Sequence, residues 1–119
     1  MPLRLHMHLI SDSTGETVTT VARAAVSQFD DVVPVEHVWF FVRTAAQLEK
    51  IVGIVEALPG LVVYTLMSPE LRHLLQERCR ALNVPCVPVL DSVMQALTTL
   101  VGSAGRPKIG RQHAMDDEY

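Results

Sequence analysis

The sequence has little of several features that mark specialised classes of protein. Only 5% of its 119 residues are aromatic, two are cysteines, and ten basic residues against thirteen acidic ones give a formal net charge of -3. A disulfide-stapled secreted domain needs more cysteine. A protein that binds nucleic acid through bulk charge needs a basic excess. The 49% of hydrophobic residues excludes a chain kept disordered by charge. We therefore expect a folded domain with no nucleic-acid partner.

Long apolar runs are also missing. Every apolar stretch is well short of the roughly 20 residues that span a bilayer, and the first ten residues, which contain two histidines, do not resemble a signal peptide. Cys79 and Cys86 do not form a paired zinc motif, and we interpret them as small buried hydrophobes in a reducing compartment. These features predict a soluble, cytoplasmic protein without a membrane partner.

A Walker A loop, G-x-x-x-x-G-K-[ST], does not occur in the sequence. The only lysines are Lys50, inside an expected helix, and Lys108, in a polar terminal segment. The sequence as given is therefore not expected to hold a nucleoside triphosphate in the manner of a P-loop.

Four short apolar runs alternate with four segments of helical periodicity. The runs are nearly continuous in apolar residues, which is typical of strands covered on both faces and hence of a parallel sheet. The segments between them repeat apolar residues at i, i+3, i+4 and i+7. The expected strands are Leu3–Ile10, Val35–Val42, Leu61–Leu66 and Pro85–Leu90, and the expected helices are Val18–Phe29, Leu48–Val55, Leu71–Leu82 and Val93–Val101.

This alternation predicts an α/β fold, a three-layer sandwich with helices on both faces of a four-stranded parallel sheet. Pro88 cannot donate a ladder hydrogen bond, so the fourth strand should lie at an edge, which the order 2-1-3-4 allows. Residues 1–102 form the predicted domain. Residues 103–119 are polar, without apolar periodicity, and are expected to be a linker. Helix starts are expected at Thr44, Ser68 and Asp91, and helix stops at Asn83 and Gly102.

The most informative loop follows the first strand and leads directly into the first helix. In an open parallel sheet, ligands bind beyond the carboxyl ends of the strands, where the strand order reverses, and the first strand lies beside that point in the predicted order. Free backbone N–H groups at a helix N-terminus favour an anion, glycine permits close approach, and hydroxyl groups add donors. We therefore predict a phosphate- or target-binding loop made of Ser11, Asp12, Ser13, Thr14, Gly15, Glu16 and Thr17.

Two features leave this interpretation open. Ser13 and Glu16 have the spacing of a capping box, which needs no ligand. The carboxylates of Asp12 and Glu16 would repel a phosphate unless a positive charge offsets them. Arg43, at the end of the second expected strand, is the candidate for that charge, although it could equally be a solvated surface arginine.

A metal site is not expected. His6 and His8 lie two apart on a strand and so point to one face, but no third ligand lies nearby in the sequence. Hydrogen-bonded histidines beneath a helix are the favoured interpretation. Trp39 and Phe40 are expected to pack in the core.

The block H-M-H-L-I-S-D-S-T-G-E-T-V-T-T-V-A-R-A-A-V-S-Q-F, residues 6–29, closely resembles the start of the pyruvate, phosphate dikinase regulatory proteins. The similarity continues in the same order through later blocks and covers nearly the whole chain. These blocks are P-V-E-H-V (34–38), Val42-Arg43, L-V-V-Y-T-L (61–66), P-E-L-R (69–72), V-P-C-V (84–87) and G-R-Q-H (110–113).

The resemblance implies a bifunctional serine/threonine protein kinase. Family members use ADP to phosphorylate a threonine of the dikinase, and use inorganic phosphate to remove that phosphoryl group and release pyrophosphate. A related branch acts on phosphoenolpyruvate synthase, but the S-D-S-T-G-E-T form is more similar to the dikinase branch.

In the family, the nucleotide-binding P-loop lies in a C-terminal domain beyond the position of Tyr119. The resemblance therefore carries over no catalytic residue, and it implies ADP and phosphate as cofactors of the longer protein, with none expected on this chain alone, which we expect to be inactive. The loop at 11–17, Arg43, Gln112 and His113 carry over as motif positions.

Two other functions remain open at this stage. Flavodoxin-like FMN-binding domains have a hydroxyl-rich loop after the first strand, although Asp12 stands where that pattern has serine or threonine. Alternatively, the chain is a non-catalytic module for dimerisation or target docking, and the sequence does not decide whether it forms a homodimer. A receiver domain is disfavoured, because the third strand ends in Leu66-Met67-Ser68 without an acceptor aspartate.

Overall fold

Strands and helices alternate along the chain as the sequence pattern predicts. The structure is a computed structural model and describes residues 2–102. The elements are β1 (Leu3–Ser11), α1 (Glu16–Val26), β2 (Val32–Trp39), α2 (Ala45–Ala57), β3 (Leu61–Thr65), α3 (Pro69–Leu82), β4 (Cys86–Pro88) and α4 (Asp91–Val101).

The four strands form one parallel sheet in the order β2-β1-β3-β4, which confirms the predicted fold class and strand order. β1 lies between β2 and β3, and it pairs with β2 over Leu3–Ile10 and with β3 over Met7–Ser11. The short strand β4 pairs only with β3, so Pro88 lies on an edge strand, where a missing N–H donor costs no ladder bond. The polar loop after β1 therefore emerges beside the reversal of strand order.

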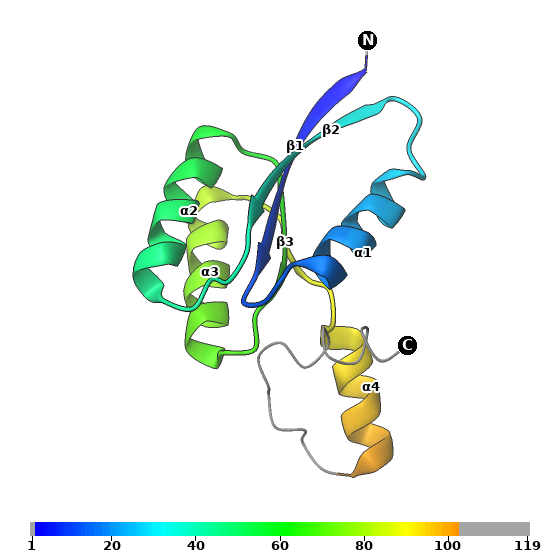
Figure 1. The fold of residues 1–119 in the computed structure, drawn as a ribbon, viewed down its shortest axis with the longest axis vertical. Coiled ribbons are helices and arrows are strands. Elements are labelled where there is room, and N and C mark those ends of the chain that lie inside the picture. Colours follow the sequence, from blue (N-terminus) through cyan, green and yellow to red (C-terminus); the bar gives the residue numbers. More distant parts are fainter. Residues whose placement is uncertain (1, 103–119) are drawn as a thin grey trace.

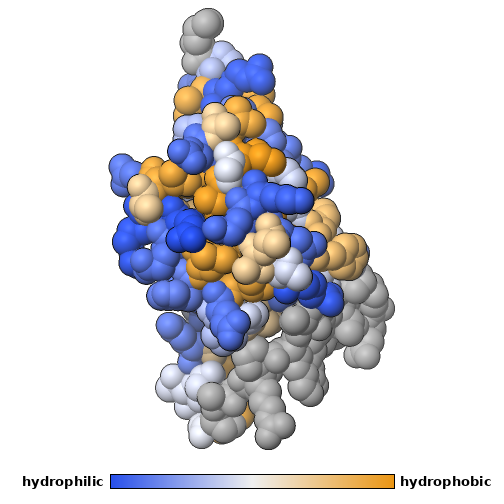
Figure 2. All heavy atoms as spheres, turned by 90° about the vertical axis from the view of Figure 1, so that its left-hand side faces the viewer, coloured by the Kyte–Doolittle hydropathy of each residue, from blue (hydrophilic) through white to orange (hydrophobic). Residues whose placement is uncertain are grey.

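Alternation along β1 sends its side chains to two apolar clusters. Met7 and Leu9 face α1 and pack with Val18 of that helix. Ile10 faces the opposite side and joins a larger cluster beneath α2 and α3 that includes Tyr64 of β3. Figure 1 shows α1 on one side of the sheet and α2 and α3 on the other. Seen from the α2 and α3 side, the surface mixes hydrophilic side chains with smaller apolar areas (Figure 2).

The helix α4 departs from the expected layering. It extends beyond the end of the sheet instead of lying against a face (Figure 1). None of its residues is buried, and five of its apolar side chains are exposed, among them Leu97 at 50% and Leu100 at 83%. The helical layers on the sheet are therefore built by α1, α2 and α3.

Most predicted helix boundaries agree with the structure. Thr44 and Ser68 cap α2 and α3 through their side chains, and Asn83 and Gly102 end α3 and α4 in the left-handed conformation. Asp91 is not the N-cap of α4. Leu90 holds that position, and Asp91 lies in the first turn, where its carboxylate pairs with Arg72.

The second strand is displaced from its expected position. It spans Val32–Trp39 and not Val35–Val42. The chain leaves the sheet after Trp39, and Phe41 adopts a left-handed conformation with φ 57. Val42 is nevertheless buried at 2% exposure, which explains why the apolar run continues past the end of the strand.

Other expectations have mixed outcomes. Cys79 and Cys86 are free thiols that pack in or against the larger core, as predicted. Within residues 2–102, no helix is long and apolar enough to cross a membrane. The expected linker at 103–119, with Gln112 and His113, lies outside the described residues, so these expectations stay predictions.

Candidate functional site at the carboxyl ends of the strands

The loop between β1 and α1 lies at the carboxyl edge of the sheet, where the sequence places the candidate site. Most of it is buried. The exposed fraction is 1% for Ser11, 1% for Asp12 and 6% for Ser13. Gly15 is also buried, whereas Thr14 and Thr17 are half-buried and Glu16 is exposed. The first half of the loop is therefore part of the packed structure, and the second half reaches the surface.

Ser11 and Ser13 join the loop to its neighbours. The Ser11 hydroxyl oxygen accepts hydrogen bonds from the backbone N–H of Ser13 at 3.0 Å and from the Thr65 hydroxyl at 3.2 Å. The backbone carbonyls of Ser11 and Ser13 accept from the N–H groups of Val42 and Phe41, both at 2.9 Å. These bonds fix the loop between the end of β3 and the segment that follows β2.

Asp12 is buried and connects the β1–α1 loop to the end of β3 and the loop that follows it. Its Oδ2 accepts a hydrogen bond from the backbone N–H of Met67 at 2.8 Å, and its own N–H donates to the Thr65 carbonyl at 3.2 Å. Its other carboxylate oxygen, Oδ1, is buried without a hydrogen-bond partner. Burial raises the pKa of Asp12, while the Met67 N–H and the charge of Arg43 act in the opposite direction. The carboxylate is thus held inward, away from the surface half of the loop.

Arg43, the residue that the sequence offers as a positive charge beside the loop, contacts that loop. Its Nε donates to the backbone carbonyl of Asp12 at 2.6 Å, although the residue as a whole is exposed. Arg43 is therefore not simply a solvated surface arginine. It places a guanidinium group beside the loop while leaving part of that group in contact with solvent.

Gly15 is the N-cap of α1 and has a conformation that few other residues adopt. Its φ is +82, and a Cβ atom built at this position would lie 2.1 Å from Cε1 of Phe40. Glycine is thus needed for the turn and for the approach of a phenyl ring. Because the N-cap is Gly15 and makes no side-chain cap bond, the alternative of a Ser13–Glu16 capping box is wrong.

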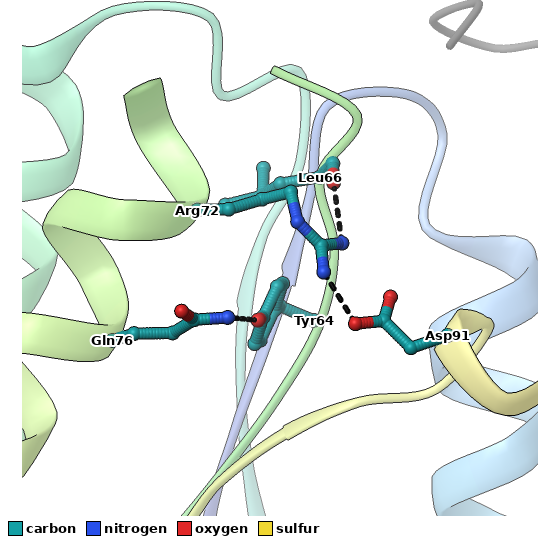
Figure 3. A network of polar contacts seen from close by, with 5 residues as sticks. All are labelled: Tyr64, Leu66, Arg72, Gln76 and Asp91. Carbon is teal, nitrogen blue, oxygen red and sulfur yellow. Dashed lines mark hydrogen bonds and ion pairs between the residues drawn. The ribbon is translucent and has the colours of Figure 1, made fainter. Parts of the chain in front are cut away.

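Sequence reasoning missed a second polar cluster at the same edge (Figure 3). The Arg72 guanidinium donates to the Leu66 carbonyl at 3.1 Å, pairs with the Asp91 carboxylate and lies over the Tyr64 ring, 5.6 Å from its centroid. Gln76 donates to the Tyr64 hydroxyl. A cavity of about 670 Å³ opens beside Arg72, between the start of α3 and α4. In the sequence, the signal for this cluster is limited to the opposite charges of Arg72 and Asp91, which lie in the first turns of α3 and α4.

The histidines of β1 form a stack of rings with His37 of β2. His8 Nε2 lies 2.8 Å from the Leu58 carbonyl, and His6 Nδ1 lies 2.9 Å from His37 Nε2. The rings of His6 and His8 both stack on the ring of His37, with centroid separations of 5.1 Å for His6 and 4.8 Å for His8. Burial lowers the pKa of His8. In the part of the chain that the structure describes, no three His, Cys, Asp or Glu side chains are grouped to hold a metal.

The sequence of this chain matches a known family and several known proteins. Residues 7–119 match the family described as kinase/pyrophosphorylase. A protein of Sphingopyxis alaskensis is 47% identical over 98% of this chain, one of Rhodospirillum rubrum is 44% identical over 96%, and one of Novosphingobium aromaticivorans is 48% identical over 98%. All three are named as pyruvate, phosphate dikinase regulatory proteins. The matches cover 43%, 42% and 41% of those proteins, so this chain spans less than half of their length.

Proposed function

This chain belongs to the kinase/pyrophosphorylase family, and from that premise we propose that it forms the N-terminal domain of an enzyme that regulates pyruvate, phosphate dikinase. The relatives that it resembles carry this regulatory role in their names. They are more than twice as long as the part matched here, and the sequence given has no Walker A loop. The phosphoryl-transfer machinery is therefore assigned to the rest of the longer protein.

The proposed chemistry has two directions. As a kinase, the enzyme transfers the terminal phosphoryl group of ADP to a threonine hydroxyl of the dikinase, and AMP and a proton leave. As a phosphorylase, it uses inorganic phosphate to attack the phosphothreonine, which restores the hydroxyl and releases pyrophosphate. Both directions need a site that holds a phosphate group close to the target segment.

We assign that holding role to the surface half of the loop between β1 and α1. The observation that carries the assignment is that α1 begins directly after Gly15, in the surface half of this loop, so that the positive end of the helix dipole lies there. Its amide groups and the helix dipole attract an anion. The Arg43 guanidinium lies beside the same loop, and the buried Asp12 carboxylate is turned toward Met67. The bound group would be inorganic phosphate or the phosphothreonine of the target.

A phosphate titration of the 119-residue chain tests this assignment. We expect millimolar phosphate to shift the amide NMR signals of Gly15, Glu16 and Thr17, because the anion would bind beside these residues. Arg43→Ala should weaken the response several-fold. Arg4→Ala removes an equal charge at the exposed amino end of β1 and serves as the matched control. No shift in the parent chain, or equal responses from the two variants, would contradict the assignment.

Binding of the target gives a separate test. The dikinase, in its threonine-phosphorylated and unmodified forms, would be passed over the immobilised chain in an interferometry experiment. We expect the phosphorylated form to bind more tightly, and free phosphate to compete with it. If neither form binds while the amide signals still respond to phosphate, the chain holds the anion but does not dock the target. Phosphoenolpyruvate synthase would be the second target to test.

A further inference from the structure

The two cysteines of the chain lie at the opposite edge of the sheet from the proposed phosphate site. Cys79 is in the last turn of α3, and Cys86 is the first residue of β4. Between them the helix ends at Asn83, which has a left-handed conformation with φ 58, and the Val84 N–H donates back to the Cys79 carbonyl at 2.9 Å. This reversal returns the chain to the helix end that carries Cys79.

The register of the sheet sends the Cys86 side chain to the face that α3 covers. Cys86 lies opposite Val62 of β3, and Val62 belongs to the same core cluster as Cys79. The next residue, Val87, lies opposite Val63, which belongs to the cluster beneath α1 on the other face. Cys86 accordingly packs against the cluster that contains Cys79, and a side-chain hydrogen bond joins the two thiols.

A surface hollow leads to Cys79, although only 1% of this residue is exposed. The hollow has a volume of about 250 Å³ and is lined by Cys79 and the residues of the turn that follows it. The hydrogen bond with Cys86 lowers the pKa of the Cys79 thiol, whereas the same bond and burial raise the pKa of Cys86. Because the thiolate is the reactive form of cysteine, Cys79 is the nucleophile of the pair and Cys86 is its resolving partner.

We propose that Cys79 and Cys86 form a peroxide-sensitive dithiol site, which hydrogen peroxide oxidises to a disulfide and thiol reductants restore. The site has no part in the phosphate binding proposed above and does not depend on it. Disulfides that form in a reducing compartment are usually transient and redox-sensing. A buried pair beside a hollow that admits only a small solute fits that use.

The oxidation proceeds in two steps. The Cys79 thiolate attacks one oxygen of hydrogen peroxide, the O–O bond breaks, and the hydroxide that leaves takes up the proton of the thiol to become water. Cys79 is then a sulfenic acid. The Cys86 thiol attacks that sulfur and loses its proton, and the hydroxyl group leaves as a second water. The two sulfurs have then lost two electrons to one peroxide, and thiol–disulfide exchange with a dithiol returns them.

Oxidation of the 119-residue chain tests the site directly, because the chain has no other cysteine. After treatment with sub-millimolar hydrogen peroxide and alkylation in denaturant, intact mass spectrometry should show a chain that has lost two hydrogen atoms and carries no alkyl group. Reduction with dithiothreitol before alkylation should give two alkylated cysteines. Thiols that stay free, thiols that are oxidised without joining, or disulfides between separate chains would overturn the proposal.

A matched control moves one thiol to the other face of β4. Cys86→Val combined with Val87→Cys keeps the composition and changes the position of the thiol by one residue. We expect no disulfide within this chain, and a sulfenic acid at Cys79 that dimedone traps. Equal disulfide formation in the parent and the exchanged chain would show that closeness in sequence, and not the fold, brings the thiols together.

Urea unfolding of the parent chain gives a readout that needs no variant. The oxidised chain should unfold at a higher urea concentration than the reduced chain, because the cross-link restricts the unfolded state and the fold already holds the two thiols together. A lower unfolding midpoint after oxidation would mean that the disulfide distorts the fold, and it would overturn the assigned pairing.

Discussion

Gly15 offers the sharpest test of how the loop and the first helix are built. Gly15→Ala should destabilise the fold for two separable reasons. The residue has φ +82, where an alanine costs about 1 kcal/mol relative to glycine. The added methyl would also lie 2.1 Å from the Phe40 ring, and relieving such a clash in a packed region costs about 1–3 kcal/mol. The sum is about 2–4 kcal/mol, a large share of the stability of a small domain.

Urea unfolding followed by far-UV circular dichroism measures this loss. Gly53→Ala is the matched control, because Gly53 lies within α2 and a Cβ there would meet nothing within 4 Å. That substitution should stabilise the chain by about 0.5–1 kcal/mol. The two identical changes are thus expected to shift the unfolding midpoint in opposite directions.

A double-mutant cycle separates crowding from backbone strain. In a Phe40→Ala background the methyl at position 15 has room, so Gly15→Ala should cost only the strain of about 1 kcal/mol. The same cost with and without the phenyl ring would show that Phe40 does not crowd this position. A Gly15→Ala chain as stable as the parent would refute the geometry assigned to the start of α1.

Substitutions at two buried ionisable residues, Asp12 and His8, are tested by urea unfolding across pH. Asp12→Ala should cost about 1–3 kcal/mol, because it leaves the Met67 N–H without its acceptor, whereas Asp12→Asn keeps an acceptor and should cost less. Burial raises the pKa of Asp12 above its usual value of 3.8. The stability that the protonated Asp12 contributes is therefore fully present below pH 3.8 and is lost as the pH rises through the folded-state pKa. Asp12→Asn should remove that pH dependence. Burial lowers the pKa of His8, so the stability that the neutral ring contributes above pH 6.5 is lost as the pH falls through the folded-state pKa. His8→Gln should remove that loss. For either residue, a pH profile that the substitution leaves unchanged would contradict the assignment.

The strand order could be predicted because two local signals depend on it directly. Nearly continuous apolar runs identified strands covered on both faces, and Pro88 restricted the fourth strand to an edge. Both signals depend on which backbone and side-chain groups each residue has. These signals therefore do not depend on how the side chains pack. The observed strand order, β2-β1-β3-β4, agrees with them.

The position of α4 could not be predicted in the same way. Its periodicity shows that one face is apolar, but a periodic pattern does not identify the surface that covers this face. The end of the second strand is a similar case. Val42 is buried although it lies outside the sheet, so hydrophobicity alone extends the predicted strand too far.

The contacts of the candidate site depend on pairs of residues far apart in the sequence. Asp12 and Met67 are 55 residues apart, and Arg72 and Asp91 are 19 apart. Local spacing instead predicted a repulsive carboxylate at Asp12 and an N-cap at Asp91. Only the folded sheet, which brings the carboxyl ends of β1, β3 and β4 together, shows that both carboxylates have structural partners.

The first half of the S-D-S-T-G-E-T block is engaged in the fold of the loop, and this determines how the proposed phosphate site has to be tested. The Ser11 hydroxyl and the Asp12 carboxylate are already engaged by Thr65, Ser13 and Met67, so changing them alters the fold of the loop before it alters any ligand contact. The attraction that the start of α1 exerts on an anion comes from the helix dipole, which no side-chain substitution removes. A loss of binding on mutating the first half of the block would thus report a change in loop stability. A substitution of Arg43, which follows β2, instead changes the charge beside the start of α1.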